Sequence, residues 1–383
     1  MKLSLTHLSQ LSDLPVDQII DVRSPAEYAE DHVPGAINLP VLDDAERARV
    51  GTIYVQQSRF TARKIGAALV SRNAAHHLET ALADRDGAWQ PLIYCWRGGQ
   101  RSGSFATILE QVGWRVQLLE GGYRSYRRLV AEMLHDAPLP HRVVLLDGNT
   151  GTAKTDILLR LAEQGHQVLD LEGLANHRGS IFGDVATPQP AQKAFESAIA
   201  AQLSAMDSAR PVFVEAESSR IGTLGVPPRL WKAMCDAPRV RLRVPVAARA
   251  AYLTRAYDDL SADPARLHRS INGLAPFHVT ERIARWADLA RKHQFQPLAQ
   301  ELMVEHYDPR YAKSTSRAGA EAAALLDLQD LEDATLDAEL DRIAATMLSA
   351  DAERRPVVED SGTEDSVAEG CSQDRKTDSR SGD

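Results

Sequence analysis

Short apolar runs alternate with amphipathic stretches along the first 135 residues. The strand candidates are residues 17–22, 91–95 and 115–119, and the helix candidates between them are residues 62–71 and 102–112. Strands that alternate with helices predict a parallel or mixed α/β sheet. Residues 137–141 contain two prolines and indicate a linker after this segment.

A second series of the same kind starts at residue 142. An apolar run at residues 142–147 precedes a glycine-containing turn and a helical pattern at residues 155–164. Further strand candidates are residues 167–171, 211–215 and 239–244. Residues 247–348 have a helical pattern, with breaks expected at Asn272-Gly273 and Asp308-Pro309. This series predicts a second α/β domain with a helical C-terminal part.

Composition places the chain among ordinary soluble proteins, with 383 residues, 44% of them hydrophobic and 25% charged. No apolar run approaches the roughly 20 residues that a membrane span requires, so no membrane contact is expected. The N-terminus has no basic segment followed by a long apolar one, so we expect no secretory signal. The cysteines Cys95, Cys235 and Cys371 are too far apart for a disulfide framework or a metal knuckle, which indicates a reducing, cytoplasmic location.

The charge is unevenly distributed. Residues 321–383 contain 6 Lys/Arg and 18 Asp/Glu, a net charge of −12, so residues 1–320 carry +3 within the total of −9. Residues 239–293 contain 11 Lys/Arg and 5 Asp/Glu, a net charge of +6. A local basic surface attracts a polyanion even on an acidic chain, although scattered, solvated arginines give the same count. Residues 351–383 have few large apolar side chains, and we expect them to be disordered.

A cysteine lies between a strand candidate and a helix candidate, in the segment YCWRGGQRS. Backbone N–H groups at the start of a helix and the helix dipole lower the pKa of a nearby thiol. Arg97 and Arg101 add positive charge, and Gly98 and Gly99 let the backbone curl around an anion. Cys95 is therefore a candidate nucleophile for chemistry on sulfur, selenium or phosphorus. The alternative is a buried structural cysteine.

Three separated motifs resemble the rhodanese domain. They are DVRSPAEY at residues 21–28, HVPGAINLP at residues 32–40 and EGGY at residues 120–123. The resemblance covers residues 5–135 and implies that Cys95 carries sulfur or selenium, as a persulfide or perselenide. The usual sulfurtransferase loop, C-x-x-G-x-[RT], is one residue shorter than the C-x5-R spacing from Cys95 to Arg101. The longer loop predicts a cradle for a tetrahedral, phosphate-like group, so a rhodanese-fold phosphatase is a rival interpretation.

The segment GNTGTAKT follows a strand candidate and opens a helix candidate. It resembles the Walker A loop, in which backbone N–H groups hold a diphosphate, the lysine neutralises its charge and the hydroxyl holds Mg²⁺. The diphosphate-binding candidates are Gly148, Gly151, Lys154 and Thr155. Ala153 replaces a glycine of the pattern, and its methyl group restricts the backbone, which puts nucleotide turnover in question. The alternative is a turn that precedes a helix by chance.

Further candidates for substrate or Mg²⁺ contact follow two other strand candidates. The segment VFVEAES resembles a Walker B strand, with Glu215 in place of the usual aspartate and Glu217 close behind. The alternative is a strand that ends in surface carboxylates. His177 and Arg178 lie in a polar, glycine-bounded stretch after a strand candidate, where ligands bind in α/β sheets. We expect them to contact a diphosphate or an anticodon, and the alternative is a capped loop with a solvated arginine. No residue set by itself identifies a metal site.

The combination of these loops resembles the tRNA 2-selenouridine synthase family. The matching motifs are LEGLANHRGS at residues 171–180, PQPAQKAFE at residues 188–196, EAES at residues 215–218 and HYDPRY at residues 306–311. The likeness spans residues 5–315. It implies an enzyme, a transferase, that converts 2-thiouridine at the wobble position of tRNA to 2-selenouridine. The implied route places a geranyl group from geranyl diphosphate on the sulfur, and selenium from selenophosphate then displaces it through a Cys95 perselenide.

This resemblance also predicts the domain organisation and the partners. We expect a rhodanese-like domain at residues 1–136, a P-loop NTPase-like α/β domain with a helical tRNA-binding part at residues 137–320, an acidic helical segment at residues 321–350 and a disordered tail at residues 351–383. No tightly bound cofactor is implied. The substrates are tRNA, selenophosphate and geranyl diphosphate, Mg²⁺ is a candidate ion, and selenophosphate synthetase is a candidate protein partner.

The P-loop is expected to hold the diphosphate of geranyl diphosphate rather than a nucleotide, which would make Ala153 tolerable. Two other classes of protein stay open at this point. One is a rhodanese-fold sulfurtransferase or phosphatase fused to a P-loop kinase. The other is a non-catalytic chalcogen carrier, which would need neither a P-loop nor affinity for tRNA.

Overall fold

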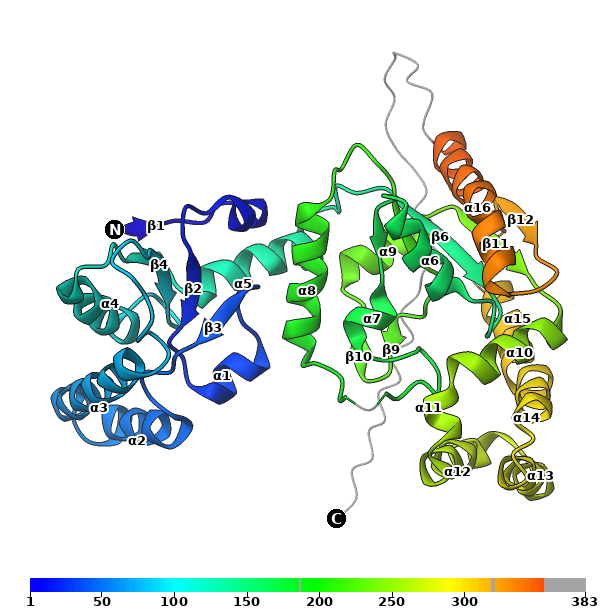
Figure 1. The fold of residues 1–383 in the computed structure, drawn as a ribbon, viewed down its shortest axis with the longest axis horizontal. Coiled ribbons are helices and arrows are strands. Elements are labelled where there is room, and N and C mark those ends of the chain that lie inside the picture. Colours follow the sequence, from blue (N-terminus) through cyan, green and yellow to red (C-terminus); the bar gives the residue numbers. More distant parts are fainter. Residues whose placement is uncertain (186, 318–320, 355–383) are drawn as a thin grey trace. The chain divides into compact units, whose positions relative to one another are not determined.

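The computed structural model describes residues 1–185, 187–317 and 321–354. The chain divides into two compact units (Figure 1). Unit 1 consists of residues 1–141, 169–210 and 217–231, and unit 2 of residues 142–168, 211–216 and those from 232 onwards. Residues 355–383 of the predicted disordered tail lie outside the described residues, and the last described helix continues through Glu353.

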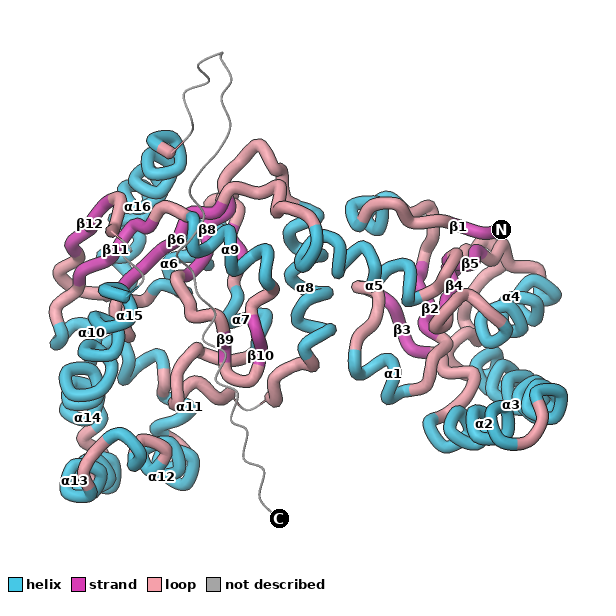
Figure 2. Tube along the Cα trace, turned by 180° about the vertical axis from the view of Figure 1, so that it is seen from behind, coloured by secondary structure: helices cyan, strands magenta, loops and turns pink. Residues whose placement is uncertain are grey.

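The sheet of unit 1 has five parallel strands in the order β1-β5-β4-β2-β3. They are β1 (Lys2–Leu3), β2 (Gln18–Asp21), β3 (Ala36–Asn38), β4 (Pro91–Tyr94) and β5 (Gln117–Leu119). All four residues of the central strand β4 are buried. Parallel strands are buried on both faces when helices cover the sheet. Figures 1 and 2 show α2, α3 and α4 on one side of these strands and α1 and α5 on the other.

Helices surround this sheet. They are α1 (Pro25–Glu30), α2 (Asp44–Gln56), α3 (Arg59–Glu79), α4 (Gln100–Val112) and α5 (Tyr123–Ala131), with the 3-10 helix η1 (Leu8–Asp13) and the π-helix η2 (Glu132–Asp136). Ser24 and Glu27 form a capping box at the start of α1, and Pro25 occupies its first turn. This cap fixes the backbone of Glu27, which the site uses.

Unit 1 also contains a helical segment from beyond the linker. Its elements are α7 (Leu171–Ala175), α8 (Gln192–Ala205), β9 (Arg220–Ile221), β10 (Leu224–Gly225) and the first part of α9 (Pro228–Asp236). Helix α8 buries Phe195, Ile199 and Leu203 completely. Its buried Glu196 pairs with Arg127 of α5. Helix α8 is therefore an integral part of the unit that carries the cysteine loop.

The sheet of unit 2 has the strand order β12-β11-β6-β8-β7. Its strands are β6 (Val143–Gly148), β7 (Val168–Leu169), β8 (Val212–Glu215), β11 (Arg239–Arg243) and β12 (Ala324–Asp327). Strands β12, β11, β6 and β8 run parallel to one another. The central strand β6 is buried along its whole length and leads directly into the phosphate loop and α6 (Lys154–Glu163).

The region predicted to be helical from residue 247 to 348 contains a strand. Strand β12 pairs with β11, and α16 (Asp333–Glu353) lies beside it (Figure 1). Helix α16 contributes Leu336, Leu340, Ile343 and Met347 to the core around β6 and α6. The acidic composition of this segment does not reveal the apolar side chains that α16 buries. Residues 321–350 thus complete the second sheet.

The remaining helices of unit 2 pack into a layer of their own (Figure 2). They are α10 (Val246–Ala256), α11 (Asp258–Ser261), α12 (Pro264–Asn272), the 3-10 helix η3 (Ala275–Phe277), α13 (Thr280–Arg291), α14 (Phe295–Leu302), the π-helix η4 (Met303–Tyr307) and α15 (Asp308–Arg317). The expected break after Asn272 is confirmed. The break expected at Asp308-Pro309 is wrong, because η4 continues into α15 and Pro309 lies in its first turn, where a missing N–H costs little.

Candidate functional site

Cys95 lies at the end of β4, directly before helix α4. Its side chain is buried, with 3% of the residue exposed. The Gly99 N–H donates to Sγ at 3.3 Å and the Ser102 hydroxyl donates to Sγ at 3.2 Å. Gly99 is the N-cap of α4, so the donors come from the positive end of a helix. The sulfur is therefore held by groups that stabilise negative charge.

The pKa of Cys95 is lowered from its ordinary value. Burial alone would raise it, because a charged thiolate loses hydration. The hydrogen bond from the Ser102 hydroxyl, the backbone N–H groups of Ser102 and Arg97 and the charge of Arg101 together outweigh that effect. Ser102 is thus a specific donor to the thiol of Cys95, and the sequence motifs alone do not single it out. A hydroxyl seven residues after the cysteine, just past Arg101, was the available signal.

The loop after Cys95 is clamped by the start of helix α5. The Tyr123 N–H donates to the Cys95 carbonyl at 2.8 Å, and the Arg124 N–H donates to the Trp96 carbonyl at 3.1 Å. Gly122 has a φ of 62°, and a Cβ there would overlap the Cys95 carbonyl oxygen. Only glycine meets both conditions. Gly122 of the EGGY motif therefore allows helix α5 to approach the cysteine loop closely.

The two arginines of the loop differ. Arg101 donates to Glu27 through two contacts of 2.6 and 3.3 Å, whereas the Arg97 side chain is exposed. Burial would raise the pKa of Glu27, but the hydrogen bond and the charge of Arg101 lower it. Glu27 thus stays ionised and fixes the direction of Arg101. Glu27 belongs to the DVRSPAEY motif, and only the tertiary structure makes it the partner of Arg101.

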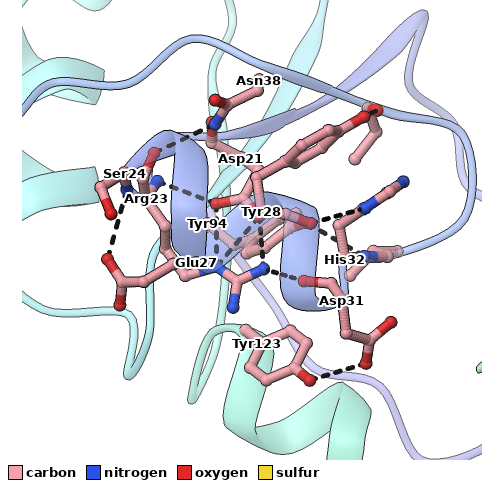
Figure 3. A network of polar contacts seen from close by, with 12 residues as sticks. Asp21, Arg23, Ser24, Glu27, Tyr28, Asp31, His32, Asn38, Tyr94 and Tyr123 are labelled. Carbon is pink, nitrogen blue, oxygen red and sulfur yellow. Dashed lines mark hydrogen bonds and ion pairs between the residues drawn. The ribbon is translucent and has the colours of Figure 1, made fainter. Parts of the chain in front are cut away.

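A polar network, much of it buried, includes Tyr123, whose backbone contacts this loop (Figure 3). Arg23 donates to Asp21 at 2.6 and 3.0 Å and to the Asp31 carbonyl, and its guanidinium lies 3.9 Å from the centre of the Tyr123 ring. The Tyr123 and Ser197 hydroxyls both donate to the Asp31 carboxylate, at 2.6 and 2.8 Å. Burial raises the pKa of Asp31 despite these donors. The D-x-R motif therefore supports the fold around Tyr123, and both of its charged side chains are buried.

Three residues of the phosphate loop have a positive φ. Gly148 has a φ of 158°, Gly151 of 82° and Ala153 of 59°. A left-handed backbone costs a residue with a side chain about 1 kcal/mol. Ala153 therefore keeps the shape of the glycine that it replaces at a modest energetic cost. The Lys154 ammonium donates to the Gly148 carbonyl at 3.0 Å, so the lysine folds back over the loop, and Thr155 lies in the first turn of α6.

Helices α10 and α15 hold the phosphate loop from outside. Asp308 accepts from Arg249 at 2.9 and 2.7 Å and from the Asn149 amide at 2.8 Å. Arg249 also donates to the Thr150 carbonyl at 3.0 Å. The same helix α15 carries Tyr311, whose hydroxyl donates at 2.6 Å to a carboxylate at the end of β6. The HYDPRY motif thus acts as a clamp on the phosphate loop.

The remaining candidates fall into two places. Glu215 is buried at the end of β8, next to β6, where the register pairs it with Leu146 just before the phosphate loop. His177 accepts from the Gly179 N–H at 3.0 Å. Carboxylate oxygens of Glu172 and Glu217 lie 2.6 and 2.9 Å from the position that a Cβ on Gly179 would take. The structure therefore brings His177 and Glu217 together around Gly179, in unit 1. Arg178 is half-buried, and its backbone N–H donates to the Gly183 carbonyl.

Neither a metal cluster nor a membrane span is found in the described part of the chain. No group of three or more His, Cys, Asp or Glu side chains there has an arrangement that could hold a metal ion. P-loop proteins hold Mg²⁺ with a loop hydroxyl, an acidic residue and the substrate phosphates, so an ion of that kind needs no cluster of three such side chains. Among the same residues, no helix is both long and apolar enough to cross a bilayer.

Acidic partners offset the basic charge of residues 239–293. Nine of its eleven basic side chains form ion pairs. The pairs are Arg241–Asp147, Arg243–Asp327, Arg249–Asp308, Arg255–Glu332, Arg266–Asp259, Arg282–Glu305, Arg285–Glu301, Arg291–Asp288 and Lys292–Asp288. Six of the acidic partners lie outside the segment. The net charge of +6 is therefore offset by residues that are distant in sequence.

Comparison with known proteins gives both loops a family context. Residues 4–129 match the rhodanese-like domain, and residues 141–280 match the tRNA 2-selenouridine synthase AAA domain. A tRNA 2-selenouridine synthase of Pseudomonas syringae pv. syringae is 34% identical over 335 residues, which cover 79% of this chain and 88% of that protein. Proteins of the same name from Bordetella bronchiseptica and Chromohalobacter salexigens are each 33% identical, over 84% of this chain and 94% of theirs.

The chain belongs to the tRNA 2-selenouridine synthase family.

Membership in the tRNA 2-selenouridine synthase family settles several expectations. The resemblance stated from sequence is confirmed, and so is the α/β fold of a rhodanese domain followed by a P-loop domain with a parallel sheet. The chain is an enzyme, a selenium transferase that acts in tRNA modification. The kinase fusion and the non-catalytic carrier are thereby set aside. The roles of individual residues stay predictions.

Proposed function

We propose that this enzyme converts 2-thiouridine at the tRNA wobble position to 2-selenouridine in two steps, one at each loop. In the first step the thiocarbonyl sulfur attacks the allylic carbon of geranyl diphosphate. The carbon–oxygen bond breaks, diphosphate leaves and the uridine loses its N3 proton. In the second step the selenium of selenophosphate attacks C2 of the base and expels geranethiolate. A thiocarbonyl sulfur is a poor leaving group, and alkylation makes it a good one.

The phosphate loop is the proposed site of the geranyl diphosphate. The observation that carries this proposal is the P-loop geometry reached with Ala153, together with Lys154 at the start of α6. The backbone N–H groups and the helix N-terminus bind a diphosphate of any origin. Lys154 stabilises the charge that develops on the departing diphosphate, and Thr155 would hold Mg²⁺ against it. Glu215, at the end of the neighbouring strand, is a second candidate contact for that ion.

The cysteine loop is the proposed site of selenophosphate. Its helix N-terminus and Arg97 and Arg101 suit an anion with a tetrahedral phosphate group. Cys95 is the proposed nucleophile of the selenation half. His177, Arg178 and Glu217 are proposed substrate contacts, because His177 and Glu217 gather around one glycine-bounded turn. Selenophosphate synthetase remains a proposed source of the selenophosphate.

Nucleoside mass spectrometry of tRNA treated with paired variants tests this division. Lys154→Ala should leave 2-thiouridine unconverted, with geranyl transfer reduced by about a hundredfold or more, because several kcal/mol of electrostatic stabilisation are lost. Supplying S-geranyl tRNA to this variant should restore selenation. Cys95→Ser should consume 2-thiouridine without yielding 2-selenouridine. Normal geranyl transfer by Lys154→Ala, or strict dependence of either step on ATP, would return the loop to nucleotide binding.

For the tRNA we propose a contact at Phe277 and Arg310, in place of the arginines that ion pairs neutralise. Phe277 is 49% exposed, and the Arg310 guanidinium lies 4.0 Å from the centre of its ring. In the described residues Arg310 has no carboxylate partner. An exposed ring with a stacked, uncompensated cation suits an unpaired base and its phosphate.

Binding of tRNA at several salt concentrations tests this contact. Arg310→Ala should flatten the log–log salt slope by nearly one unit, because one phosphate contact is lost. Phe277→Ala should weaken binding and leave the slope unchanged, since stacking is not ionic. Phe60→Ala removes another exposed phenylalanine, 75% exposed in unit 1, and is the matched control. Equal behaviour of the Phe60 and Phe277 variants would place the tRNA elsewhere.

A further inference from the structure

The donors around Cys95 are aimed at its sulfur atom. The Ser102 hydroxyl and the Gly99 N–H both donate to Sγ, and Ser102 is completely buried. In a perselenide the reactive charge lies on the terminal selenium. Donors fixed on Sγ instead favour states in which the sulfur itself is negative, that is, when it attacks or departs. The loop has the spacing C-x5-R-S, from Cys95 through Arg101 to Ser102.

The oxidation states of selenium and phosphorus also favour a role for the Cys95 sulfur as a nucleophile towards phosphorus. Selenophosphate holds selenium at the oxidation level of selenide. Loading it on a thiolate as a perselenide would pass two electrons to phosphorus and leave phosphite. Attack of the thiolate on phosphorus needs no oxidant or reductant. In that case the bond between selenium and phosphorus breaks with its electron pair on selenium.

We propose that Cys95 accepts the phosphoryl group, and not the selenium, in the second half of the reaction. This inference rests on the proposed function, in which attack by selenophosphate leaves a selenium–phosphorus bond on the base. The Cys95 thiolate attacks phosphorus and forms a sulfur–phosphorus bond, and the 2-selenouridine departs with the electron pair of the broken bond. Water then attacks the phosphocysteine, inorganic phosphate leaves with one oxygen from that water, a proton passes to solvent, and the electron pair returns to Sγ.

The rest of the loop suits a phosphoryl group. Gly98 has a φ of 64°, and a Cβ there would lie 2.9 Å from the Leu119 carbonyl oxygen, so the loop closes tightly behind the sulfur. Glu27 holds the Arg101 guanidinium in one direction by two contacts. A fixed, planar guanidinium binds two phosphoryl oxygens at once. When water attacks the phosphocysteine, Ser102 stabilises the departing thiolate. The Ser102 hydroxyl therefore governs the lifetime of the phosphocysteine.

Acid quenching of the full-length enzyme with S-geranyl tRNA and phosphorus-radiolabelled selenophosphate tests the proposal. The wild type should show transient label on the protein, and Cys95→Ser none. Ser102→Ala should raise the labelled fraction by about tenfold, because the leaving thiolate loses one hydrogen bond to a charged atom. Ser102→Thr keeps a hydroxyl and should return the label towards the wild-type level. Cys235→Ser is the matched control and should behave like the wild type.

Mass spectrometry of the labelled peptide distinguishes the alternatives. A phosphorus adduct on Cys95 supports the proposal. A selenium isotope pattern on Cys95, or phosphite as the product, would overturn it and favour the perselenide. Absence of label from both the wild type and Ser102→Ala would also overturn it. Geranyl transfer from geranyl diphosphate to 2-thiouridine tRNA is measured separately with the same enzyme preparations, and its loss in all of them would contradict the proposed function without bearing on the chemistry at Cys95.

Discussion

Replacing Asp308 with alanine tests whether helix α15 holds the phosphate loop. The carboxylate accepts two hydrogen bonds from Arg249 and one from Asn149, and the Arg249 side chain is only 4% exposed. Removing the Asp308 carboxylate leaves the buried Arg249 guanidinium with the Thr150 carbonyl as its remaining partner among the described contacts. Breaking a buried pair from one side typically costs about 3–5 kcal/mol. Because Asp308 is itself 24% exposed, we expect the lower end, about 3 kcal/mol.

Asp327→Ala is the matched control. Asp327 also accepts two hydrogen bonds from an arginine, Arg243, at 2.8 and 2.6 Å. Both side chains of this pair are more than half exposed, at 56% and 58%. An exposed pair contributes about 0–1 kcal/mol, since water solvates each charge when the other is removed. Both variants therefore remove a carboxylate that accepts two hydrogen bonds from one arginine, and the main difference is that the Asp308 pair is buried and also holds Asn149.

Urea unfolding and calorimetric binding of geranyl diphosphate measure the two consequences. We expect Asp308→Ala to lower the free energy of unfolding by about 3 kcal/mol and to weaken diphosphate binding by about tenfold or more, because Asn149 and Thr150 lose their anchor. Asp327→Ala should change neither by more than about 1 kcal/mol. Equal destabilisation by the two variants, or unchanged diphosphate binding by Asp308→Ala, would refute the clamp.

Three further outcomes are expected. Gly122→Ala should abolish selenation and spare geranyl transfer, since a Cβ there overlaps the Cys95 carbonyl; selenation at the wild-type rate would contradict the close approach. Alkylation of Cys95 by iodoacetamide should reach half its maximal rate below pH 8.5, about the ordinary pKa of a thiol, and Ser102→Ala should shift that midpoint upwards. Burial and the charges of Arg310 and His278 lower the pKa of His306 to about 4. Between about pH 6.5 and 4, His306 is therefore protonated in the unfolded chain and neutral in the folded chain. The free energy of unfolding should fall as the pH falls through this window. His306→Gln should flatten that dependence, and an unchanged slope in urea titrations would count against it.

The two loops could be read from sequence because their requirements are local. A strand, a tight turn with glycines and a helix N-terminus follow one another within a dozen residues, and the chemistry depends on backbone N–H groups that any such turn presents. The cysteine loop and the phosphate loop therefore appear where the motifs predicted them. The conformation of Ala153 was not predictable in the same way. Its left-handed backbone depends on the shape of the whole loop, which Asp308 and Arg249 contact at Asn149 and Thr150 from far along the chain.

The charges and the acidic C-terminus were decided by tertiary structure. Counting residues 239–293 predicted a basic surface, but partners such as Asp147, Asp327 and Glu332 neutralise its arginines. The acidic segment adds β12 and α16 to the second sheet, because its apolar residues face that sheet and its carboxylates face solvent or arginines. Pairing and burial depend on which residues meet in space. Composition and spacing do not determine which residues meet in space. A turn that binds an anion, in contrast, is encoded within its own few residues.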